Sequence, residues 1–206
     1  MPFLGVIGGK VIGEYETPPP GWAQPYLPFL AIGDQGDRLL YAFTPDKFLI
    51  SAGAGMVLRK RVAERYLKEI ANSPLRKSLD PVGTKLSRSG DIDMALCAFD
   101  EGFAKGYSPD LILTHLIPKE RLRLTYLSEL RGEGEFCDTL LALIRGFKMP
   151  NIYATFFRSC VAIVRRCIAA GGFFWQQGVI ELSILGGRRR AVRQFQNSRE
   201  DRQCGR

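Results

Sequence analysis

The chain has 206 residues, a formal net charge of +8 and 46% hydrophobic residues, a composition that excludes an intrinsically disordered protein. Its five cysteines include no C-x-x-C pair, which argues against a zinc ribbon and is typical of reduced thiols. We see neither a signal peptide nor an apolar run long enough for a membrane helix, so we expect a cytoplasmic protein.

The first half is predicted to begin with a strand and continue through a loop that its prolines keep from being helical. Further along, we expect a glycine break between two apolar runs, an amphipathic helix and a polar loop. The ranges are 3–12 for the strand, 17–28 for the loop, 34–37 for a turn, 47–60 for the interrupted apolar run, 59–70 for the helix and 75–88 for the polar loop. Trp22 in the first loop either packs in the core or offers a stacking surface, and packing is the more general role.

The next helix has the clearest pattern in the chain. Ser89 can cap its start, and apolar residues recur at helical spacing until Gly106 ends it. The apolar positions are Ile92, Leu96, Phe99 and Phe103. A brief buried strand at 111–113 and helices at 119–131 and 135–147 follow.

Asp91 falls in the first turn of that helix, where free N–H groups and the helix dipole favour its ionised form. Such a carboxylate can act as a general base towards a hydroxyl, or it can simply cap the helix. With Asp93 it also spells D-x-D, which could hold a divalent cation through oxygen ligands.

His115 is the only histidine and ends the short strand shortly before Pro118. Its imidazole is either a metal ligand or a structural side chain. Asp91 and His115 lie about one α/β unit apart, and ligands of open α/β sheets bind where strands end and helices begin. We therefore expect both side chains at one site.

Five segments, taken in order, resemble the C-terminal half of a family 2 glycosyltransferase with the GT-A fold. They are the glycine-rich strand at 4–9, Pro-Pro-Pro-Gly-Trp at 18–22, Gly-Ala-Gly-Met-Val-Leu-Arg at 53–59, Ser-Gly-Asp-Ile-Asp-Met at 89–94 and His-Leu-Ile-Pro-Lys-Glu-Arg-Leu at 115–122. The resemblance covers roughly residues 3–131. It implies an α/β fold, with a partial GT-A-like mixed sheet flanked by helices.

The resemblance also implies an activity, the inverting transfer of a sugar from a nucleotide-sugar donor to a hydroxyl acceptor on a glycan or a lipid-linked sugar. Asp91 would be the general base, and His115 would complete the site of Mn²⁺ or Mg²⁺. The donor and acceptor cleft would be lined by Trp22, Gly53, Ala54, Gly55, Gly90, Asp93 and Arg121. The family's nucleotide-binding half, with its own D-x-D, has no counterpart here, so we expect a truncated enzyme. Whether this half is active by itself is left open.

The basic charge is concentrated after residue 151, where ten arginines face three acidic residues. We divide the chain into a glycosyltransferase-like part at 1–150, an amphipathic helical extension at 151–187 and a disordered Arg-rich tail at 188–206. A basic amphipathic helix at 152–170 could contact the inner face of a membrane or pack on the domain. The alternative function is a non-catalytic binding or scaffold module held to a membrane surface or polyanion by this basic end; no motif indicates specific nucleic-acid binding.

Overall fold

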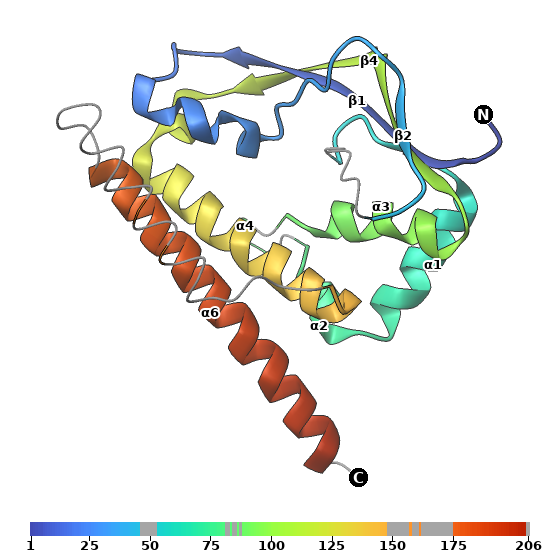
Figure 1. The fold of residues 1–206 in the computed structure, drawn as a ribbon. Coiled ribbons are helices and arrows are strands. Elements are labelled where there is room, and N and C mark those ends of the chain that lie inside the picture. The colour runs from blue at the N-terminus through green and yellow to red at the C-terminus, as the bar shows by residue number, and fades with distance from the viewer. Residues whose placement is uncertain are drawn as a thin grey trace.

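A four-stranded mixed sheet forms one layer of the molecule (Figure 1). The computed structural model describes residues 1–45, 53–80, 83, 86, 88–147, 157, 161 and 175–204. The strands are β1 (Leu4–Tyr15), β2 (Leu40–Ala42), β3 (Val57–Leu58) and β4 (Ala104–Ile117), in the spatial order β2-β4-β1-β3. β1 and β4 are parallel at the centre, and the two short strands flank them in antiparallel orientation. The predicted α/β class with a mixed sheet is confirmed.

The helices lie on one side of the central strand pair (Figure 1). They are α1 (Lys60–Ala71), α2 (Pro74–Lys77), α3 (Gly90–Asp100), α4 (Leu124–Arg145) and α6 (Trp175–Cys204), with 3-10 helices η1 (Gly21–Leu30) and η2 (Lys119–Leu122). The chain passes from β1 to the parallel β4 through α1 and α3, as parallel strands require a long crossover.

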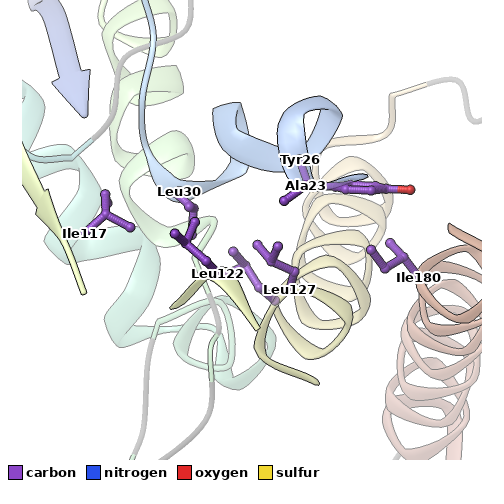
Figure 2. Close-up of a cluster of buried hydrophobic side chains, with 8 residues drawn as sticks. Ala23, Tyr26, Leu30, Ile117, Leu122, Leu127 and Ile180 are labelled. Atoms are coloured by element: carbon purple, nitrogen blue, oxygen red, sulfur yellow. The ribbon is translucent and has the colours of Figure 1, made fainter. Parts of the chain in front are cut away.

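Three clusters of buried apolar side chains hold the helices to the sheet and to one another. Figure 2 shows the first, where η1, the end of β4, η2, α4 and α6 meet around Leu30, Leu122, Leu127 and Ile180. The second joins α2, α3, α4 and α6, and the third packs α1 and α3 against β1. The C-terminal helix is therefore part of the same core as the sheet.

Strand β4 is much longer than the expected strand at 111–113, and it contains the glycine expected to end the preceding helix. The register shifts between the Gly9–Ser108 pair and the Lys10–Ile112 pair, so three residues of β4 bulge out of the ladder. Pro109 lies in this bulge, where a missing N–H breaks no ladder bond. A Cβ on Gly9 would lie 1.9 Å from the Leu111 carbonyl oxygen, so the bulge requires glycine beneath it.

Two further expectations differ from the structure. The proline-rich loop forms η1, because consecutive 3-10 turns need only i to i+3 bonds, such as that from the Ala23 N–H to the Pro20 carbonyl at 2.9 Å. The helices expected at 119–131 and 135–147 are instead the short η2 and one continuous α4, which runs through Gly132 and Gly134. Most of the helix expected at 152–170, and residues 47–52, lie outside the described residues.

The tail expected to be disordered from Arg188 onwards is helical up to Cys204. Two of its arginines pair with acidic residues of α4, Arg190 with Glu133 at 2.6 Å and Arg188 with Glu135 at 4.0 Å. Ala191 is fully buried in the second cluster. An Arg-rich composition predicts disorder only where such partners and apolar anchors are missing.

Candidate functional site

A cavity of about 670 Å³ opens between the end of η1, α3, α4 and the end of β4. Its lining includes Asp91, His115 and Arg121, three of the residues predicted from sequence, together with Arg88 and Asp138. The other 11 of its 16 lining residues are apolar or aromatic. A second depression of about 610 Å³, over β1 and β3, contains none of the predicted site residues.

Asp91 lies in the first turn of α3 and is held by two backbone donors. The Gly53 N–H donates to Oδ2 and the Ile92 N–H to Oδ1, each at 2.8 Å. Burial raises the pKa of the Asp91 carboxyl above its usual value of 3.8, although these two hydrogen bonds, and then Arg88 and Lys105, oppose that shift. A carboxylate made more basic in this way is a better proton acceptor than an ordinary exposed one.

The glycine segment at 53–55 forms the turn that brings a backbone donor to this carboxylate. The Met56 N–H donates to the Gly53 carbonyl at 3.3 Å, and Gly55 has a φ of +74°, a conformation that favours glycine. A Cβ on Gly53 would approach Asp91 Oδ2 to 2.9 Å. Gly53 is therefore needed for close approach, while Ala54 is exposed on the turn.

His115 and Arg121 form a pair at the end of β4. Arg121 Nη1 lies 3.2 Å from His115 Nε2, and because a guanidinium can only donate, Nε2 is the acceptor. The neutral ring then carries its proton on Nδ1. That atom is buried and has no hydrogen-bond partner among the described residues. Its N–H group could therefore donate a hydrogen bond to a ligand.

In this structure Arg121 contacts His115 Nε2, so a metal ion at this imidazole would require the pair to rearrange. A metal on Nε2 would have to displace Arg121, and one on Nδ1 would require the other tautomer. No group of three or more His, Cys, Asp or Glu side chains within the described part of the chain is arranged to hold a metal ion.

Two of the predicted cleft residues have packing roles. Trp22 lies on η1 and packs against the first cluster, the more general of its two predicted roles. Gly90 lets α3 start against Asp80, since a Cβ there would come within 1.7 Å of the Asp80 carboxylate. Neither residue lines the cavity. The predicted cap on α3 also differs, because the Ser89 hydroxyl donates to Asp138 at 2.7 Å and makes no capping bond.

Asp93 lies in the core, 0% exposed, rather than in the cleft. Arg76 Nη1 donates to both of its carboxylate oxygens, at 2.8 and 2.6 Å. Arg145 donates from Nε to Oδ1 at 2.8 Å and from Nη2 to the Asp93 backbone oxygen at 3.0 Å. This carboxylate ties α2 and α4 to α3, so it is not available to pair with Asp91 on a cation.

Three residues near the site were not singled out by the sequence pattern. Arg88 and Asp138 line the cavity 3.7 Å apart, and Arg88 also donates to the Phe29 carbonyl at 3.3 Å. Lys105 on β4 is 2% exposed, and burial lowers its pKa to about 8 although Asp91 opposes that shift. The signal available in the sequence was a single lysine inside the apolar run Phe-Ala-Lys-Gly-Tyr.

Comparison with protein-family models, with curated proteins and with solved structures finds no match to this chain. The function must therefore be argued from the site itself.

Proposed function

We propose that this chain acts in inverting glycosyl transfer from a nucleotide-sugar donor to a hydroxyl acceptor, on a GT-A-like scaffold. The observation that carries the proposal is Asp91, a partly buried carboxyl with a raised pKa that lines the same cavity as His115 and Arg121. The cavity thus combines a proton acceptor with hydrogen-bond donors of the kind that bind a diphosphate.

In the proposed reaction the acceptor hydroxyl lies beside Asp91. Its oxygen forms a bond to the anomeric carbon of the sugar from the face opposite the nucleotide, and its proton passes to an Asp91 carboxylate oxygen. The bond from the anomeric carbon to the phosphate oxygen breaks, and the electron pair leaves with the nucleoside diphosphate. Arg121 and the Nδ1–H of His115 stabilise that developing negative charge.

The test is to incubate the 206-residue chain with a panel of UDP-, GDP- and dTDP-sugars and simple glycosides, and to measure both products by mass spectrometry. Asp91→Asn should retain nucleotide binding and lose transfer by about a hundredfold or more, since the base is gone. Asp110→Asn, which changes an exposed carboxylate outside this cavity, is the matched control. Transfer by Asp91→Asn at the rate of the control would remove Asp91 from the mechanism.

A divalent cation, Mn²⁺ or Mg²⁺, is the cofactor that the resemblance implies, and binding it at His115 requires Arg121 to turn away from Nε2. Manganese titrations of nucleotide binding by the wild type and by His115→Ala address this directly. Equal manganese dependence in the two proteins would leave His115 as a hydrogen-bond donor.

A second candidate, attachment to a membrane surface, is favoured by one face of α6. Trp175, Val179 and Leu182 are exposed at spacings of four and three residues, with Trp175 66% and Leu182 68% exposed. The exposed Arg189 and Arg193 follow on this face at further spacings of seven and four residues. Apolar and basic side chains on one helix face can bind anionic lipid at the interface.

No helix in the described part of the chain is both long and apolar enough to cross a bilayer. For surface binding, sedimentation with vesicles that contain anionic phospholipid should pellet the wild type, and Leu182→Asp should stay in the supernatant. Leu67→Asp, at a similarly exposed leucine on α1, is the control. Equal pelleting of the two variants would exclude the α6 face.

A further inference from the structure

The cavity is elongated, because its lining follows one face of α4. Tyr126, Leu130, Asp138, Leu141 and Ala142 of this helix all line it. At the helical rise of 1.5 Å per residue, the stretch from Tyr126 to Ala142 is about 24 Å long. A cavity of about 670 Å³ that extends over such a length suits a long, narrow ligand.

Charge is unevenly distributed along this cavity. The His115–Arg121 pair belongs to β4 and η2, directly before α4 begins, so it marks one end. Asp91 lies in the middle, because its neighbour Ser89 donates to Asp138 of α4 at 2.7 Å. The charge of Asp138 is offset there by Arg88 at 3.7 Å.

The opposite end is apolar and is formed by α3 and the last part of α4. Arg145 bonds to Asp93 at 2.8 Å and to Cys97 Sγ at 3.3 Å, which places this part of α3 beside the end of α4. The lining side chains at this end are Ile92, Leu96, Leu141, Ala142 and Phe147. None of these side chains can donate or accept a hydrogen bond.

We propose that the acceptor is an amphiphile, a sugar with an alkyl chain at its reducing end, and that the chain fills the apolar end between α3 and α4. This inference rests on the proposed glycosyl transfer for the role of Asp91. The acceptor hydroxyl meets Asp91 in the middle, and the cationic end is left for the donor diphosphate. A longer, purely polar glycan would have to bury hydroxyl groups against leucines without hydrogen bonds, which costs free energy.

The experiment is to measure binding of methyl, butyl and octyl β-glucoside to the 206-residue chain by calorimetry, below micelle-forming concentrations. The sugar head group is the same in all three glucosides, so any increase in affinity comes from the alkyl chain. Each methylene that enters an apolar site contributes about 0.8 kcal/mol, which is about fourfold in affinity. We expect octyl glucoside to bind at least tenfold more tightly than methyl glucoside.

Two variants locate the alkyl chain of the ligand within the cavity. Ala142→Trp fills the apolar end and should remove the advantage of octyl over methyl glucoside, whereas Ala71→Trp, at an exposed alanine on α1, should keep it. Phe147→Asp changes a side chain that is 40% exposed, so it should fold even if Ala142→Trp does not, and it should also lower octyl affinity. Equal affinity for all three glucosides, or unchanged chain-length dependence in both cavity variants, overturns the inference.

The binding series contains no nucleotide-sugar donor, so it tests this inference separately from the proposed function. Chain-length dependence that the cavity variants remove, without transfer from any nucleotide sugar, supports the amphiphile site and contradicts the transferase. Transfer to methyl and octyl glucosides with equal KM contradicts the amphiphile site and supports the transferase.

Discussion

The partly buried Asp91 and the buried Lys105 are two ionisable side chains whose charges influence each other. Burial raises the pKa of Asp91 and lowers that of Lys105 to about 8, and each opposes the other's shift because their charges are opposite. Below pH 8 Lys105 is a cation that favours the ionised form of Asp91. The working pH range of the proposed base therefore depends on a residue that does not line the cavity.

We predict that Lys105→Met raises the pKa of Asp91 further, because the ammonium that stabilises the carboxylate is removed. NMR titration of the Asp91 carboxyl carbon measures this without any assay of activity. If transfer is detected, the acidic limb of its pH–rate profile should move to higher pH in the variant. Lys10→Met, at a lysine paired with Asp34, is the control and should leave the titration of Asp91 unchanged.

Asp93 illustrates a carboxylate with a stabilising rather than a chemical role. Its removal in Asp93→Ala leaves Arg76 and Arg145, each about nine-tenths buried, without their central anion. Breaking a buried ion pair in this way typically costs about 3–5 kcal/mol. Urea unfolding should show a loss of that size.

Asp100→Ala is the matched control for this prediction, since Asp100 also pairs with Arg145 at 2.7 Å but its side chain is 32% exposed. Its loss should cost less than about 1 kcal/mol, as for other exposed ion pairs. Similar losses in the two variants would show that the buried anion has no special role.

At the scale of elements, the sequence pattern predicted best where structure is local. Helix α3 starts at the predicted residue because its apolar spacing and first-turn carboxylates are local signals. Strand β4 was mostly missed, since its length depends on pairing with β1 about 100 residues earlier. The last helix was predicted only up to residue 187, and its continuation to Cys204 was missed because the acids that pair with its arginines belong to α4.

The contact between α4 and α6 depends on glycine at one position and tolerates a side chain at the next. A Cβ on Gly187 would lie 1.9 Å from the Gly132 carbonyl oxygen, whereas one on Gly186 meets nothing within 4 Å. Gly187→Ala should therefore separate the helices and destabilise the fold by about 1–3 kcal/mol. Gly186→Ala should stabilise it by up to about 1 kcal/mol through helix propensity.

Thermal unfolding of these two neighbouring variants measures both effects. Opposite shifts of the melting temperature are expected from the same chemical change. A higher melting temperature for Gly187→Ala would contradict the close contact between Gly187 of α6 and Gly132 of α4.

For the whole molecule, sequence reasoning could place Asp91, His115 and Arg121 at one site but not give the shape of that site. The three residues lie near element ends, which an α/β fold brings together. The length of the cavity comes from α4, which was expected as two helices with an interruption before residue 135. Gly132 and Gly134, which argue for a break in isolation, lie within the helix because α6 and Arg88 pack against them.

The direction of α6 has a consequence for how the chain folds. Ile180 packs with Leu127, Gly187 meets Gly132, and Ala191 joins Leu141, so the two helices run parallel (Figure 1). A parallel pair cannot form as a local hairpin, because the chain must first return along the full length of α4. We expect contacts across about 50 residues to form after the local turns of each helix, because closing the intervening loop costs entropy. Changes in this helix pair should then mainly accelerate unfolding and leave the refolding rate nearly unaltered, which stopped-flow kinetics of Gly187→Ala can establish.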